Sequence, residues 1–65
     1  MNGEMLYDFY MGGGELSDDE LLLLVLWLKE KINEYEAAND TGRARWFADV
    51  LAIARSDREA LAVAA

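Results

Sequence analysis

Apolar side chains recur along the middle of the chain at alternating steps of four and three residues. This spacing places them on one stripe of an α-helix, which has about 3.6 residues per turn. The stripe predicts a helix over residues 17–38 with a seam that faces a second helix. Its members are Leu21, Val25, Leu28, Ile32 and Tyr35.

The start of this helix carries a strong local signal. Residues 17–20 read S-D-D-E, which is the pattern of a capping box, and Leu16 and Leu21 have the spacing of a hydrophobic staple. Acids in a first turn also interact favourably with the positive end of the helix dipole. Capping therefore accounts for these acids without a functional role.

A second helix is predicted over residues 41–63. Asn39 suits the left-handed position that ends the first helix, and Asp40 or Thr41 can cap the second. Its broad apolar face is formed by Trp46, Phe47, Val50, Leu51, Ile53, Ala54 and Leu61. A connection this short makes the two helices antiparallel neighbours, so we predict a helical hairpin in which Tyr35 lies beside the aromatic pair of this face.

Residues 56–59 read S-D-R-E, a second capping pattern. It either restarts the helix at Ser56 or is passed through. No glycine or proline imposes a stop, so we expect a continuous helix.

Residues 4–11 can form either a strand or a helix. Apolar residues at alternate positions suit a short strand, while a set four residues apart suits one helical turn. Three glycines follow at positions 12–14, without the lysine of a phosphate-binding loop and among acids, so we interpret them as a hinge. The predicted organisation is an arm with its hinge over 1–14 and a hairpin domain over 15–65.

The first long helix is apolar on more sides than one partner helix can cover. Leu22, Leu23, Leu26 and Trp27 lie outside the seam. The missing cover is the aromatic arm folded back, a second copy of the chain, or both. We expect both, in a symmetric dimeric four-helix bundle or a larger oligomer. These four residues are the predicted self-association surface.

The chain has few residues that catalyse reactions. Its 65 residues include no cysteine and no histidine, two serines and one threonine, and each hydroxyl is placed to cap a helix. Glu30 and Glu34 share a helix face, but lysines flank them and one face offers too few ligands for a metal. We expect no enzyme, no cofactor and no metal site.

Charge is distributed unevenly along the chain. The net charge is −7, and residues 1–20 carry six acids and no cation. Such a surface repels nucleic acid and anionic lipid and favours a basic partner. The longest apolar run, Leu21 to Leu28, is eight residues, and no secretory signal is visible, so we expect a cytoplasmic protein that does not enter a membrane.

The arm supplies the candidate partner-binding residues. Tyr7, Phe9 and Tyr10 are aromatics of the kind that anchor protein interfaces, and Asp18 and Asp19 extend the acidic surface. The alternative is that the aromatics cover the leucine-rich turns of the same chain.

The second helix supplies a candidate anionic-ligand site. Trp46, Arg55 and Arg58 could hold a small nucleotide at a subunit boundary, since arginine beside an aromatic ring suits such ligands. The alternative is ion pairing of Arg45 with Asp49 and of Arg55 with Glu59.

These observations favour a small regulator, an inhibitor or adaptor that binds another protein without catalysis. Its size and charge are typical of phage and mobile-element products that block a host factor, although no motif supports that origin. Three alternatives stay open: a nucleic-acid mimic occupying a basic cleft, an oligomer that binds an anionic nucleotide, and a purely structural oligomerisation module.

Overall fold

The computed structural model describes residues 2–64, which form three helices and no strand. They are α1 (Gly3–Met11), α2 (Asp18–Ala37) and α3 (Thr41–Ala64). The predicted all-helical class is confirmed. The segment 4–11, for which strand and helix were both open, is helical.

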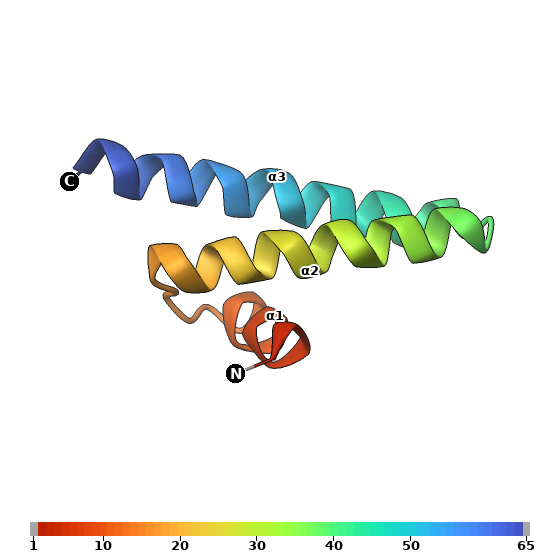
Figure 1. Cartoon of the computed structure of the whole chain (residues 1–65), viewed down its shortest axis with the longest axis horizontal. Helices are drawn as coiled ribbons and strands as arrows, with labels where there is room; N and C mark the ends of the chain where they lie inside the picture. The colour runs from red at the N-terminus through yellow and green to blue at the C-terminus, as the bar shows by residue number, and fades with distance from the viewer. Residues whose placement is uncertain (1, 65) are drawn as a thin grey trace.

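The two long helices lie side by side, and α3 runs back along α2 after a short turn (Figure 1). The short helix α1 crosses the first half of α2, close to the end where the chain terminates (Figure 1). The molecule is elongated, with extents of 40 × 22 × 17 Å. No helix within residues 2–64 is long and apolar enough to cross a membrane.

The predicted capping box at the start of α2 is confirmed. The backbone N–H of Ser17 donates to Glu20 Oε1 at 3.0 Å, and the backbone N–H of Glu20 donates to Ser17 Oγ at 3.3 Å. The first of these bonds lowers the pKa of Glu20, because it stabilises the ionised carboxylate.

The predicted end of α2 at Asn39 is also confirmed. Asn39 has a positive φ of 59° and donates to Glu36 O, and the backbone N–H of Asp40 donates to Tyr35 O at 2.8 Å. These two bonds form a Schellman motif. Asp40 Oδ1 then accepts from Arg43 N at 3.2 Å, so Asp40 rather than Thr41 caps α3.

The last helix is continuous from Thr41 to Ala64. The predicted passage through Ser56 is therefore confirmed. A capping pattern inside a helix has no effect when the preceding residues keep their own hydrogen bonds to the helix.

The three glycines at positions 12–14 follow the last residue of α1 and cap its C-terminus. Gly13 has a φ of 92°, which side chains rarely tolerate, and Gly14 N–H donates to Phe9 O at 2.9 Å. This is a second Schellman motif. It turns the chain sharply, so that α1 can lie against α2 instead of extending it.

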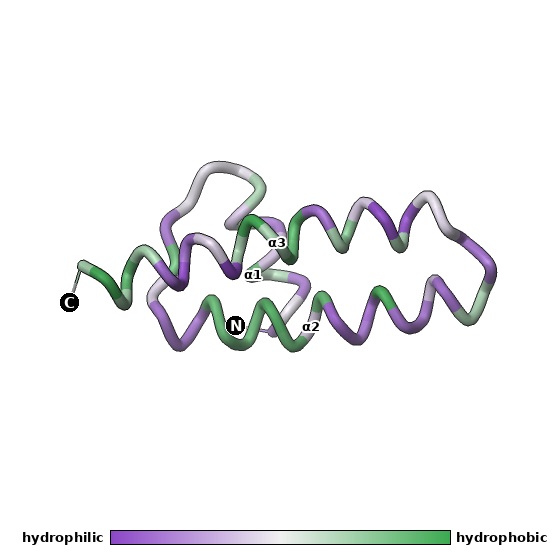
Figure 2. Tube along the Cα trace, turned by 90° about the horizontal axis from the view of Figure 1, so that it is seen from above, coloured by the Kyte–Doolittle hydropathy of each residue, from purple (hydrophilic) through white to green (hydrophobic). Residues whose placement is uncertain are grey.

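One core cluster joins all three helices. Leu6, the only fully buried residue among those described in α1, is 1% exposed and enters it. Half of the members come from residues 21–28 of α2, which form the most apolar stretch of the trace (Figure 2). The buried members are Leu6, Leu16, Leu21, Leu24, Val25, Leu28, Val50 and Ala54.

A glycine allows α1 to approach α2 closely. A Cβ atom at Gly3 would overlap the Trp27 side chain, whereas a Cβ at Gly12 would meet its nearest neighbour, a backbone oxygen, at 3.4 Å. Gly3 is therefore needed for packing, not for an unusual backbone angle.

We predict that Gly3→Ala destabilises the docking of α1, at a cost of about 1–3 kcal/mol, the usual range for overpacking. Gly12→Ala is the matched control and should change stability by less than about 1 kcal/mol. Chemical denaturation followed by tryptophan fluorescence measures both. Equal stability of the two variants would contradict the contact between Gly3 and Trp27.

Candidate binding surfaces

Two tyrosines of α1 reach across to α3. Trp46 Nε1 donates to Tyr7 Oη at 2.8 Å, and Tyr10 Oη donates to Asp57 Oδ2. The backbone of α1 packs on α2, so these side-chain bonds tie α1 to both long helices. Within the chain, Tyr7 and Tyr10 therefore cover the apolar half of α2, as the alternative interpretation of the arm expected.

An aromatic cluster lies beneath this contact. The Tyr7 ring lies 5.4 Å from both Trp27 and Phe47, and Trp27 meets Phe47 edge-on at 5.9 Å. Tyr35 stacks on Phe47 with centroids 5.5 Å apart, which confirms that predicted contact. Lys31 Nζ lies 5.5 Å from the Trp27 ring. The rings contact one another directly, and with Glu4, Asp8 and Lys31 they line a surface pocket of about 310 Å³.

The hydrogen bond to Asp57 changes the acidity of Tyr10. Burial, followed by the hydrogen bond to Asp57 and the negative charge of Asp57, together raise the pKa of Tyr10 from 10.0 to about 12. Because the folded pKa exceeds the unfolded one, neutral Tyr10 contributes its full stabilisation below pH 10 and loses it as the pH rises through 12.

The outer face of α1 points away from the core. Met5, Phe9 and Met11 are 53%, 46% and 45% exposed there, beside the exposed acids Glu4 and Asp8. We use "outer face of α1" for these five residues. The Phe9 ring lies over Gly14, where a Cβ atom would overlap it. Of the predicted aromatic anchors, Phe9 is the one that stays exposed.

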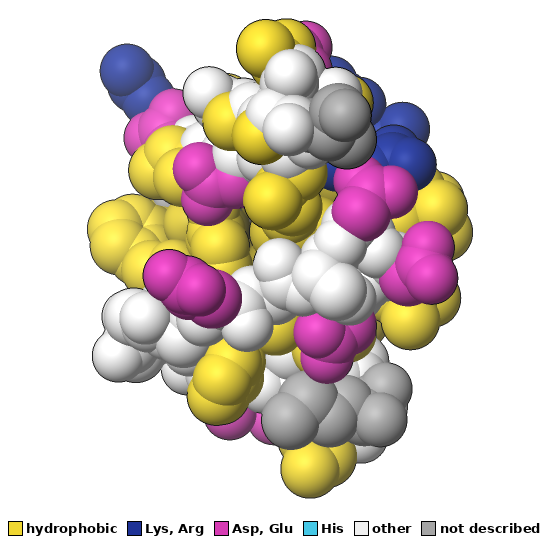
Figure 3. Space-filling view, turned by 90° about the vertical axis from the view of Figure 1, so that its left-hand side faces the viewer, with side chains coloured by type: hydrophobic (Ala, Val, Ile, Leu, Met, Phe, Trp, Pro, Cys, Tyr) yellow, Lys and Arg dark blue, Asp and Glu magenta, His cyan; other side chains and the backbone are white. Residues whose placement is uncertain are grey.

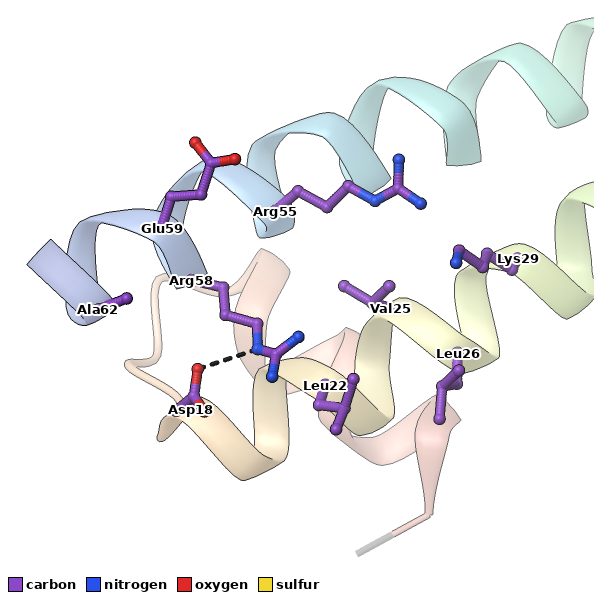
Figure 4. A pocket seen from close by; sticks show the side chains of 9 residues that line it. All are labelled: Asp18, Leu22, Val25, Leu26, Lys29, Arg55, Arg58, Glu59 and Ala62. Carbon is purple, nitrogen blue, oxygen red and sulfur yellow. Dashed lines mark hydrogen bonds and ion pairs between the residues drawn. The ribbon is translucent and has the colours of Figure 1, made fainter.

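A groove of about 460 Å³ lies between α2 and α3 (Figure 4). By helix geometry it is on the flank of α2 away from Trp27. Arg58 Nε donates to Asp18 Oδ1 across it at 2.9 Å (Figure 4). We call it the α2–α3 groove. Its lining residues are Asp18, Leu22, Val25, Leu26, Lys29, Arg55, Arg58, Glu59 and Ala62.

The predicted self-association residues fall into two groups. Leu22, Leu23 and Leu26 are 37%, 53% and 53% exposed, and the first and last line the α2–α3 groove. Trp27 instead packs against α1 and Phe47 and is half-buried. The arm therefore covers one of the four residues and leaves the three leucines in solvent.

The predicted anionic-ligand residues are not brought together. Arg55 and Arg58 line the α2–α3 groove, while Trp46 lies outside it and bonds to Tyr7. Nine residues separate Trp46 from Arg55, which is roughly half a turn beyond two full turns and places them on opposite sides of α3. A small ligand cannot contact all three side chains of one copy.

The ion pairs differ from those expected. Within residues 2–64 they join Lys31 to Glu34, Arg43 to Asp40, and Arg58 to Asp18. The expected pairs of Arg45 with Asp49 and Arg55 with Glu59 are not formed. Both have the weaker orientation for a helix, with the cation before the acid. Asp18 thus has an ion-pair partner within the chain, and both Asp18 and Asp19 are exposed.

The end of the molecule where α2 begins carries much of the acidity. Figure 3 looks at this end and shows Asp and Glu side chains distributed between apolar ones. Glu15, Asp18 and Asp19 are all exposed there. Within residues 2–64, no group of acids is arranged to hold a metal ion.

Two important contacts could not be read from the sequence. Asp57 lies 47 positions from Tyr10, and Gly3 meets Trp27 through the docking of a whole helix. Local patterns carry no signal for such pairs, because they depend on where α1 lies. The only sequence signal for the docking of α1 was an arm rich in apolar residues that precedes a helix with more apolar surface than one partner helix can cover.

Comparison with protein-family models, with curated proteins and with solved structures finds no match to this chain.

The Tyr10–Asp57 bond predicts a pH-dependent contribution to stability. Below pH 10, the free energy of unfolding of the wild type should exceed that of Tyr10→Phe by about 1 kcal/mol. This difference should disappear between pH 10 and 12. Urea denaturation at several pH values measures it. Asp57→Asn should move the loss to lower pH, since it removes a negative charge that raises the pKa; a difference independent of pH would contradict the bond.

Proposed function

We propose that this chain is a non-catalytic regulator, an inhibitor or adaptor, that binds a partner protein carrying a basic surface. The outer face of α1 is the observation that supports this best. It combines Met5, Phe9 and Met11, all large and exposed, with the acids Glu4 and Asp8. Apolar anchors within a charged rim are the usual composition of a protein-binding surface.

Charge complementarity selects the partner. Residues 1–20 contain six acids and no cation, only Asp18 of the six is paired among the ion pairs of residues 2–64, and the chain as a whole carries −7. A basic surface would be attracted over a distance set by the salt concentration, which speeds encounter and helps select the right partner. The apolar side chains would then supply the short-range contact.

We further propose that the protein acts as an oligomer of helical hairpins. The three exposed leucines of α2 support this. Leu22, Leu23 and Leu26 lie close together on one helix, and a second copy would remove them from water. A core of this size rarely supplies more than about 3–5 kcal/mol, and oligomerisation is a common remedy. Self-association would use α2 and leave the outer face of α1 free.

Affinity capture from a lysate of the native host tests the partner. We expect wild type to retain a basic protein that elutes with increasing salt, and Glu4→Gln/Asp8→Asn/Phe9→Ala to lose at least about nine-tenths of it. Circular dichroism verifies that the variant stays helical, since none of the three residues belongs to the core.

The matched control is Glu36→Gln/Asp49→Asn/Ile53→Ala. It removes the same charge and one exposed apolar side chain, but all three positions lie outside α1. The control should retain the partner. Equal loss by both variants, or capture of nothing that depends on α1, would contradict the proposal. Release of the partner by added nucleic acid would favour the nucleic-acid mimic instead.

A further inference from the structure

The α2–α3 groove carries more cations than acids, unlike the acidic chain as a whole. It brings together the cations Lys29, Arg55 and Arg58 with the acids Asp18 and Glu59. Between them lies an apolar floor and rim of Leu22, Val25, Leu26 and Ala62 (Figure 4). A purely acidic or a purely basic partner would place a like charge against some of these groups, which is costly in a contact.

We propose that the occupant of this groove is a second copy of the chain, placed antiparallel on the same groove around a twofold axis. The inference rests on the self-association proposed above and adds its geometry. In a twofold interface, both subunits present the same patch, so a patch with acid at one end and cation at the other matches its own reverse.

The groove side of α2 has this arrangement. Asp18, Leu22, Val25 and Lys29 follow one another at steps of four, three and four residues, so they lie on one helix face. The steps are the same in both directions. An antiparallel copy therefore sets Asp18 opposite Lys29 of the second copy. It also sets Leu22 over the floor of the second copy's groove at Val25, which is 5% exposed.

Charged side chains of one copy are available to pair with those of a second copy. Lys29 and Arg55 take part in none of the ion pairs formed within residues 2–64. Asp18 bonds to Arg58 through Oδ1, and its side chain is still 53% exposed. Lys29 of the second copy can therefore approach the other carboxylate oxygen of Asp18.

The same axis suits α3. Tyr35 and Phe47 stack on each other, so they mark the same level on α2 and α3. Roughly twelve residues before Tyr35 lies the midpoint of the α2 face, and roughly twelve residues after Phe47 lie Arg58 and Glu59, so these are level with each other. An axis at that level brings Arg58 of one copy near Glu59 of the other. Ala62 is small, so the two α3 helices can approach each other.

Two neighbouring leucines provide a matched test. Leu22→Gln lies inside the groove, and Leu23→Gln lies outside it, although both side chains are exposed in the single chain. Sedimentation velocity over micromolar concentrations should show that Leu22→Gln weakens the dimer about tenfold or more. The dimer of Leu23→Gln should have the same dissociation constant as the wild-type dimer.

A charge exchange tests the antiparallel order. Lys29→Glu alone and Asp18→Lys alone should each weaken the homodimer, because each sets like charges opposite one another in both halves of the interface. Mixing the two variants should restore dimers, seen as heterodimers by native mass spectrometry, because both contacts then join opposite charges. Circular dichroism checks that Asp18→Lys folds; if it does not, the leucine pair still decides.

The outcomes separate this inference from the proposed function. A dimer that depends on Leu22 and re-forms in the charge mixture supports it. A dimer that tolerates Leu22→Gln, or one that the mixture does not restore from two folded variants, overturns this geometry and leaves the proposed oligomer intact. A wild-type monomer at all concentrations overturns both the geometry and the oligomer, while binding through α1 is tested separately by capture.

Discussion

Leucines occupy nearly every side of the first half of α2, and the rest of the molecule is arranged around the need to cover them. Leu21, Leu24, Val25 and Leu28 are buried. A single neighbouring helix can cover only one stripe of another helix, so α3 alone would leave much of this segment in water. The short helix α1 covers a second stripe through Leu6 and its aromatic residues. Leu22, Leu23 and Leu26 form the stripe that stays uncovered.

The docking of α1 depends on the absence of side chains as much as on their presence. Gly3 lets the helix backbone reach the Trp27 ring, and Gly13 and Gly14 turn the chain tightly enough to bring it there. Tyr7 and Tyr10 then bond to groups on α3 that are far away in sequence. A nine-residue helix is too short to be stable alone, so these contacts hold it in place.

Local features could be predicted from the sequence, and long-range ones could not. The capping box at Ser17, the left-handed Asn39 and the continuity of α3 through Ser56 each depend on a few neighbouring residues. The seam of α2 was predictable for Leu21, Val25 and Leu28, which are buried, but the fully buried Leu24 lies outside it. On α3 the predicted apolar face was too broad: Trp46, Ile53 and Leu61 are exposed, because only part of that face meets α2 and α1. The position of α1 depends on the packing of three helices at once, and no single pattern encodes it. Within one chain Trp46 lies on the opposite side of α3 from Arg55, because closeness in sequence does not place residues on the same side of a helix.

The two surfaces proposed for binding lie on different flanks of α2, and this separation has a consequence. Trp27 faces α1, while Leu22 and Lys29 are turned roughly 140–160° away from it around the helix. A second copy in the α2–α3 groove would therefore leave both outer faces of α1 exposed. A partner with two basic sites would then meet two copies at once, and the second contact would form at a high effective concentration. Dimerisation would in this way strengthen binding without any change in the contact surface of α1 itself.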